Sequence, residues 1–139
     1  IQAAILIEKL KIFKSELKKR SELAEYYKRQ FLDLGTNIKL PKVISGATSS
    51  WAQFTIKLPI NCDREGFQIK MKEKGIPTAI YYPIPIHCQK PYKKFPISSD
   101  NLQNTNLLSK CVISLPMHAY LSFEEIEYIS KVAHEIINN

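Results

Sequence analysis

Cysteine is scarce in this sequence of 139 residues, and this scarcity limits the kinds of site that the chain can build. The three cysteines, Cys62, Cys88 and Cys111, are widely separated, odd in number and include no C-x-x-C pair. A disulfide framework and a zinc site are therefore not expected. We interpret the cysteines as small, partly buried thiols in a reducing cytoplasm.

Long hydrophobic runs are also missing. No apolar segment approaches the roughly 20 residues that a helix needs to cross a bilayer. Gln2, Glu8 and Lys9 interrupt the apolar start, so neither a membrane span nor a signal peptide is expected. The first residue, Ile1, is not a methionine, which indicates a fragment or a processed product. With 45% hydrophobic residues, the chain suits one domain, 1–139, with its own core.

Arginine is rare although the chain is basic. The formal net charge is +7, but of the 20 basic residues only Arg20, Arg29 and Arg64 are arginines. A nucleic-acid groove favours arginines, because their guanidinium groups form bidentate hydrogen bonds with bases and phosphates. We therefore expect a solvated lysine surface and no nucleic-acid partner, while the positive field can still attract a small anionic ligand.

Motifs for nucleotide or acyl chemistry are absent as well. The sequence holds no G-x-G-x-x-G, P-loop or G-x-S-x-G motif. Its carboxylates form no acid–base pair, and no lysine stands in the apolar, small-residue setting of a Schiff-base lysine. Cys88 follows His87, but no separate spacing suggests a nucleophile pair. We expect no catalytic, cofactor-binding or metal-ligating residue on this chain.

Helices account for much of what is present. Apolar residues at three- and four-residue steps, from Leu6 to Phe31, predict one long helix over 1–34 that Gly35 ends. A helix of this length more often bridges two lobes or lies along a partner than opens a small domain. Further helices are expected over 63–74, capped by Asp63, over 101–111, and from the capping box of Ser122 and Glu125 to the C-terminus.

Short strands are predicted between these helices, over 37–42, 50–58, 76–82 and 112–115. They indicate an α/β (α+β) fold with a long N-terminal helix and a small mixed or antiparallel sheet, with helices packed on one side. Tyr81 and Tyr82 alternate along the third strand, so one of them should face the core and the other a surface or partner.

The segment 78–92, T-A-I-Y-Y-P-I-P-I-H-C-Q-K-P-Y, concentrates polar and aromatic side chains in a loop that prolines stiffen. Its candidate binding residues are Tyr81, Tyr82, His87, Gln89 and Tyr92. The alternative is that the tyrosines pack in the core or on the sheet while His87 ties down the loop, and composition leaves both open.

Two further polar residues have a simpler interpretation. Gln53 lies in an apolar strand and is expected on an exposed face of the sheet. His118 lies in a turn before the last helix and is expected to bond the backbone.

Five stretches occur together in a specific order. They are I-Q-A-A-I at 1–5, S-W-A-Q-F at 50–54, G-I-P-T-A at 75–79, Y-P-I-P-I-H-C-Q at 82–89 with Tyr92, and S-L-P-M-H at 114–118 leading into L-S-F-E-E. In order and spacing they resemble the sugar aminotransferases of the DegT/DnrJ/EryC1/StrS family. The resemblance covers essentially the whole chain, but only the last third of a family member.

The resemblance implies the C-terminal small domain of a fold-type I, homodimeric transferase that moves an amino group from glutamate to a keto sugar on a nucleotide. Members acting on UDP-linked 3-keto sugars look most similar. The family's large domain, which holds pyridoxal phosphate on a lysine, is not in this sequence, so the fragment alone should be inactive. By similarity, His87, Tyr81, Tyr82 and Gln89, with Tyr92, would contact the nucleotide sugar or shape its pocket across the dimer interface.

Two other classes of protein remain open from the residues. A stand-alone basic binding module, for example one directed to RNA, would bind polyanions in a salt-sensitive way. A dimerisation module, in which the long first helix pairs with a partner, would show a mass that depends on concentration.

Overall fold

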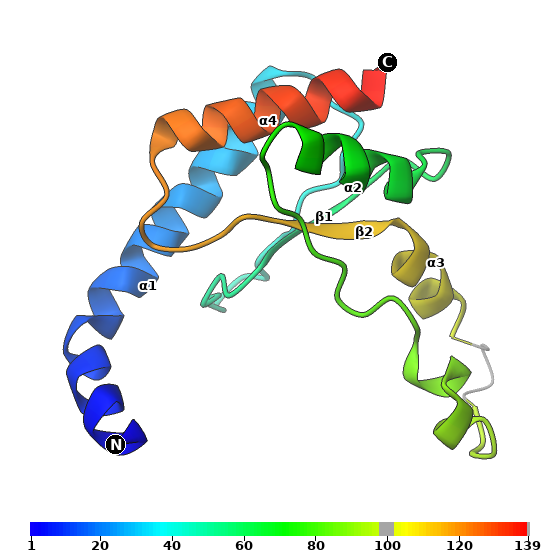
Figure 1. Ribbon diagram of the computed structural model, residues 1–139, viewed down its shortest axis with the longest axis horizontal. Helices are drawn as coiled ribbons and strands as arrows, with labels where there is room; N and C mark the ends of the chain where they lie inside the picture. The colour runs from blue at the N-terminus through cyan, green and yellow to red at the C-terminus, as the bar shows by residue number, and fades with distance from the viewer. Residues whose placement is uncertain (98–101, 139) are drawn as a thin grey trace.

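The structure is a computed structural model that describes residues 1–97 and 102–138 (Figure 1). Asn101, where the sequence predicts the start of a helix, lies outside the described residues. In chain order the elements are α1 (Gln2–Asp33), β1 (Phe54–Lys57), α2 (Arg64–Glu73), the short 3-10 turns η1 (Ile86–Cys88) and η2 (Lys90–Tyr92), α3 (Gln103–Cys111), β2 (Val112–Leu115) and α4 (Phe123–Asn138).

The sheet is antiparallel and pairs β1 with β2, with Phe54 opposite Leu115. The prediction of strands over 37–42 and 76–82 is wrong. Each of these segments forms a single β-bridge, from Lys39 to Lys57 beside β1 and from Ala79 to Ser114 beside β2. Across the sheet, the backbone therefore runs in the order Lys39, β1, β2, Ala79. The two outer segments pair at one residue each and do not count as strands.

Proline explains why the outer segment at 76–82 fails to extend. Pro77 has no N–H to donate to a ladder. Only Ala79 exchanges two backbone bonds with Ser114, at 3.0 and 2.8 Å, before the chain leaves the sheet. Tyr81 and Tyr82 are consequently 48% and 79% exposed, and the prediction that one of them faces the core is wrong.

The strand predicted over 50–58 is also shorter than expected. Trp51 has a φ of 47°, in the left-handed region, so the chain turns there and does not run straight into β1. The ring of Trp51 is buried and packs at 5.9 Å from that of Phe54. Trp51, which favours a strand in the sequence, therefore lies in a turn and packs its ring into the core.

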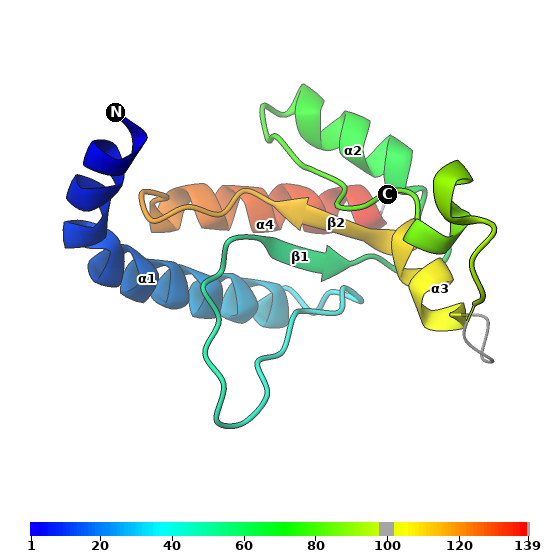
Figure 2. The same cartoon turned by 90° about the horizontal axis from the view of Figure 1, so that it is seen from below.

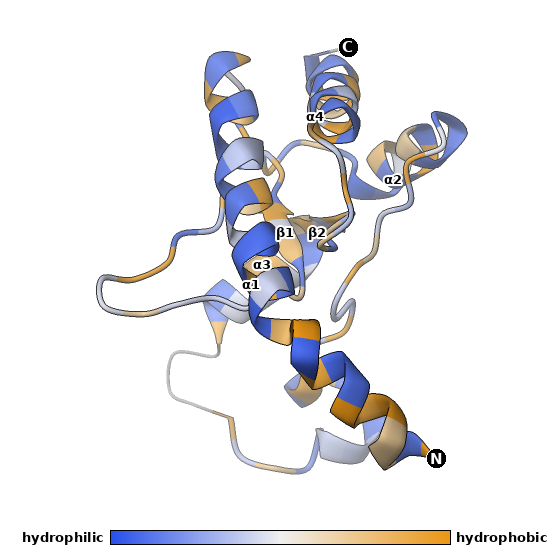
Figure 3. Ribbon diagram, turned by 90° about the vertical axis from the view of Figure 1, so that its left-hand side faces the viewer, coloured by the Kyte–Doolittle hydropathy of each residue, from blue (hydrophilic) through white to orange (hydrophobic). Residues whose placement is uncertain are grey.

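The helices α1, α2 and α4 cover one face of the sheet, as Figure 1 and Figure 3 show and as the sequence predicts. Seen from below in Figure 2, the strands lie in front of α4, so none of the described helices forms a layer on the opposite face. The alternating burial along β1 agrees, because Phe54 and Ile56 are fully buried while Thr55 and Lys57 are half-buried. The core joins this strand face to the helices through Tyr27, Phe31, Phe67, Met71, Ile113, Ile126 and Ala133.

Helix ends follow the predicted capping chemistry. Ser122 Oγ accepts from the Glu125 N–H at 3.1 Å, and Glu125 Oε2 accepts from the Ser122 N–H at 2.8 Å, which confirms the capping box. Asp63 caps α2 by accepting from the Glu65 N–H. Gly35 ends α1 with a φ of 62°.

The long helix α1 divides into two halves with different surroundings. Its second half buries Leu23, Ala24, Tyr27 and Phe31, whereas its first half projects from the body (Figure 1). Figure 3 shows hydrophobic residues along this projecting part. The apolar stripe of the sequence is therefore continuous, but the structure exposes the side chains Ile5, Leu6, Leu10 and Phe13.

Among residues 1–97 and 102–138, no helix combines the length and apolar character that a membrane span requires.

Candidate functional site

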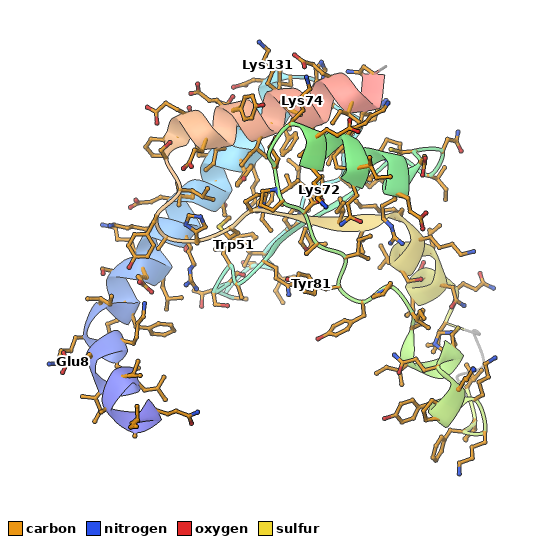
Figure 4. The ribbon with its side chains drawn as sticks, in the orientation of Figure 1. Glu8, Trp51, Lys72, Lys74, Tyr81 and Lys131 are labelled. Atoms are coloured by element: carbon orange, nitrogen blue, oxygen red, sulfur yellow. The ribbon has the colours of Figure 1, made fainter. Side chains whose placement is uncertain are left out.

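An open hollow of about 650 Å³ lies between the proline-rich loop and α3. Four of the five residues singled out in the sequence line it, namely Tyr81, Tyr82, Gln89 and Tyr92. Thr105, Leu108 and Ser109 of α3 form the facing wall. In Figure 4 the side chain of Tyr81 points into the space beneath the sheet. We call this space the tyrosine hollow.

Local backbone bonds shape the loop that carries these side chains. The Cys88 N–H donates to the Pro85 carbonyl at 2.9 Å, and the Tyr92 N–H donates to the Gln89 carbonyl at 3.0 Å, which folds the chain into η1 and η2. The side-chain amide of Gln89 donates to the Ile84 carbonyl at 3.2 Å. Because proline fixes φ, these turns restrict the loop before any ligand binds.

His87 occupies a different position from the other four residues. It does not line the tyrosine hollow, and its Nε2 lies 2.8 Å from Oδ1 of Asn106 on α3. An amide oxygen only accepts, so this bond requires the tautomer with a proton on Nε2. The bond ties the loop to α3, and His87 acts on the hollow by holding one wall against the other.

Much of the surface around the tyrosine hollow is aromatic or aliphatic and open to solvent. Tyr82 is 79% exposed, and the large aliphatic side chains Ile84, Ile86 and Leu108 are also exposed. Proteins that act alone seldom leave contiguous apolar surface of this kind uncovered. This exposure is typical of a surface that a ligand or another part of a protein covers.

The two remaining sequence candidates agree with their simpler interpretations. Gln53 is exposed next to β1, on the helix-free side of the sheet. His118 Nδ1 accepts from the Tyr120 N–H at 3.2 Å, which is the expected backbone bond. The contributions of Thr105 and Leu108 to the site were not predicted, because an ordinary polar and an ordinary apolar residue on a helix carry no local signal of a binding wall.

The described residues do not fit pyridoxal phosphate. This cofactor needs a lysine for its aldehyde and a partner for its pyridine nitrogen. The lysines are exposed apart from Lys28 and Lys57, which are half-buried, and none of the described residues that line the tyrosine hollow is charged. Within the same described ranges, no group of three potential ligands could hold a metal ion.

Comparison with known proteins gives relatives along nearly the whole chain. A UDP-2-acetamido-2-deoxy-3-oxo-D-glucuronate aminotransferase from Pseudomonas aeruginosa is 35% identical over 132 residues, which are 93% of this chain and 34% of that protein. A dTDP-3-amino-3,6-dideoxy-alpha-D-galactopyranose transaminase from Aneurinibacillus thermoaerophilus is 34% identical over 134 residues, with the same two shares. The chain therefore spans about a third of the length of these relatives.

A solved structure shares the fold. The crystal structure of a DegT DnrJ EryC1 StrS aminotransferase from Brucella abortus matches with a TM-score of 0.88 and 33% identity, covering 99% of this chain and 35% of that one. The sequence model of the DegT/DnrJ/EryC1/StrS aminotransferase family matches residues 1–133 of this chain. The sequence, the fold and this match agree, and the chain belongs to the DegT/DnrJ/EryC1/StrS aminotransferase family.

Proposed function

We propose that this chain is the C-terminal domain of a nucleotide-sugar aminotransferase that moves an amino group from glutamate to a keto sugar. The observation that carries the proposal is the tyrosine hollow, an open surface on a chain of this family to which the described residues bring no charge. The names of the two relatives, which concern a UDP-linked and a dTDP-linked sugar, support a nucleotide sugar as the substrate.

In this proposal the chain binds and orients the substrate without moving protons. The rings of Tyr81, Tyr82 and Tyr92 offer apolar faces and hydroxyl groups, a combination that suits a sugar ring or a planar base. Gln89 uses its amide nitrogen to hold the loop, which leaves its side-chain oxygen able to accept a bond from a sugar hydroxyl. His87 keeps the loop against α3 through Asn106.

Pyridoxal phosphate would supply the chemistry of amino transfer. We assign its binding, and its lysine, to the part of the complete protein that corresponds to the uncovered two thirds of the relatives, since the residues described here do not fit it. The isolated chain should then show no absorbance band of a lysine-bound cofactor after mixing with pyridoxal phosphate, and no amino transfer.

The partners follow from the same surfaces. We propose a homodimer in which the exposed apolar loop meets the second subunit, so that the substrate pocket forms across the interface. A UDP-linked 3-keto sugar is our preferred substrate, supported by the name of the Pseudomonas aeruginosa relative. We further propose a cytoplasmic enzyme without nucleic-acid or membrane partners, which agrees with three free cysteines.

The substitution Tyr82→Ala in the complete enzyme tests this function. Tyr82 is 79% exposed, so its truncation should leave folding and cofactor content unchanged. We expect kcat/KM for the keto nucleotide sugar to fall about 10-fold or more, since a stacking aromatic contact is lost. The measurement is steady-state amino transfer from glutamate, together with the absorbance of the bound cofactor.

The matched control is Tyr128→Ala, because Tyr128 is a half-exposed tyrosine of α4 whose hydroxyl bonds the Lys74 carbonyl outside the tyrosine hollow. It should keep full activity. Equal activity of Tyr82→Ala and wild type, or a parallel loss of cofactor, would contradict the role assigned to the hollow.

A further inference from the structure

Two smaller hollows continue the tyrosine hollow along the helix-free face of the sheet. The middle hollow, about 220 Å³, is lined by Gln53, Thr78, Tyr81 and Ser114 among others. The outer hollow, about 410 Å³, is lined by residues that include Lys42, Trp51, Gln53 and Thr55. Tyr81 lines both the tyrosine and the middle hollow, and Gln53 lines both the middle and the outer hollow. Neighbouring hollows therefore share one lining residue each, and we call the three together the groove.

The middle hollow has a mixed lining, in which the neutral polar side chains of Gln53, Thr78 and Ser114 stand among apolar residues. Ser114 Oγ lies 2.8 Å from Oγ1 of Thr55, which lines the outer hollow. Thr78 Oγ1 is buried and has no hydrogen-bond partner in the described part of the chain. A buried hydroxyl without a partner is costly. The residues of 1–97 and 102–138 that line the middle hollow carry no charge, which favours hydroxyl, carbonyl or amide groups over phosphate.

Gln53 differs from the other two glutamines near this groove. The Gln68 amide donates to the Thr78 carbonyl at 3.1 Å, and the Gln89 amide donates to the Ile84 carbonyl at 3.2 Å. The side chain of Gln53 makes no hydrogen bond to any residue in 1–97 or 102–138, and it is exposed. Its amide can both donate and accept, and it stands where two of the hollows meet.

We propose that Gln53 is a specificity-determining residue, which recognises a neutral substituent of the sugar ring in the middle hollow. This inference rests on the proposed function. A space of about 220 Å³ lies below the range of roughly 300–1,000 Å³ of whole ligand sites, so it suits one ring of a larger substrate whose remainder lies in the tyrosine hollow. The substituent is a hydroxyl or an acetamido group, because each of these can pair with the side-chain amide of Gln53.

The test uses the complete enzyme with Gln53→Leu, which keeps a similar size and removes both hydrogen-bonding groups. Two keto nucleotide sugars that differ only in bearing an acetamido or a hydroxyl group at one ring position serve as substrates. We expect kcat/KM for the preferred substrate to fall about 10- to 100-fold, and the ratio between the two substrates to move towards one. Amination of the cofactor by glutamate alone, followed by absorbance, should remain at the wild-type rate, because that half-reaction does not involve the sugar.

Gln30→Leu is the matched control, since Gln30 lies on α1 in the helix layer, on the other side of the sheet. It should retain the wild-type ratio of the two substrates. Thermal unfolding of both variants should match the wild type. A Gln53→Leu enzyme with unchanged kcat/KM and unchanged substrate ratio would overturn the role of Gln53 while leaving the proposed function intact. Failure of the wild-type enzyme to aminate any keto nucleotide sugar would overturn the proposed function and this inference together.

Discussion

Tyr27 shows how a single side chain can connect the layers of this domain. Its ring stacks on that of Phe54 with centroids 4.7 Å apart, and its hydroxyl donates to the Pro116 carbonyl at 3.0 Å. Burial raises the pKa of Tyr27 far above its ordinary value of 10.0. The protonated hydroxyl is therefore part of the folded state, and ionisation opposes folding.

The variant Tyr27→Phe should lower the free energy of unfolding by about 1 kcal/mol near pH 7, the usual loss for one buried hydrogen bond. A group whose pKa is raised in the folded state stabilises it fully below the unfolded pKa, and this contribution is lost as the pH rises above about 10. The wild type should therefore lose more stability there than the variant, and the gap between them should shrink. Urea unfolding at pH 7 and at alkaline pH measures both effects, and a gap that widens with pH would contradict this account.

Residues of the site were predictable to different degrees. Tyr81, Tyr82, Gln89 and Tyr92 stood out in the sequence because aromatic and amide groups were concentrated between prolines, and they do line one hollow. His87 stood out for the same reason, but its ring forms a hydrogen bond with Asn106. The two residues are 19 positions apart in the sequence, so no local pattern predicts this contact. Whether these five residues bind substrate stays a prediction.

At the scale of elements, α1 is anchored where it leaves the body. Glu16 is buried there, and Tyr120 Oη, from the turn before α4, donates to its carboxylate at 2.5 Å. Lys9 and Arg20 each approach the same carboxylate to 3.9 Å. The hydrogen bond from Tyr120 is the main cause that lowers the pKa of Glu16, with the positive charges of Lys9, Arg20 and Lys19 adding to it.

Replacing Glu16→Gln should therefore destabilise the protein at neutral pH. A carboxyl group whose pKa is lowered in the folded state contributes stability above its ordinary pKa of 4.5, and this contribution is lost as the pH falls through the lowered value. The difference between variant and wild type should disappear in acid. Thermal unfolding between pH 3 and pH 7 follows it.

Glu8→Gln is the comparison for this experiment, because among the described residues Glu8 pairs with Lys11 alone, on the exposed face of the same helix. Such a pair contributes little, so its loss should change the free energy of unfolding by less than about 0.5 kcal/mol at any pH. Equal effects of the two substitutions would show that the contact with Tyr120 does not anchor α1.

At the scale of the whole molecule, one core joins the helices to the narrow sheet, and Phe54 lies in it without any exposed surface. Phe54→Ala should cost about 3–5 kcal/mol, a large share of the roughly 5–15 kcal/mol that stabilises a typical domain. Phe95→Ala, a matched change at a side chain that is 56% exposed, should cost well under 1 kcal/mol. Urea unfolding of the two variants provides the comparison, and similar losses would argue against a single core.

The sequence by itself determined the helices, their caps and the proline-braced loop. These depend on neighbours a few positions apart, such as Ser122 and Glu125 at the start of α4, so the signal is local. Only the tertiary structure decided that the segments at 39 and 79 would each keep one bridge, that both Tyr81 and Tyr82 would face outward, and that α3 would form the second wall of the hollow. Those outcomes arise where distant segments meet, because pairing, burial and enclosure are set by the packing of the whole chain.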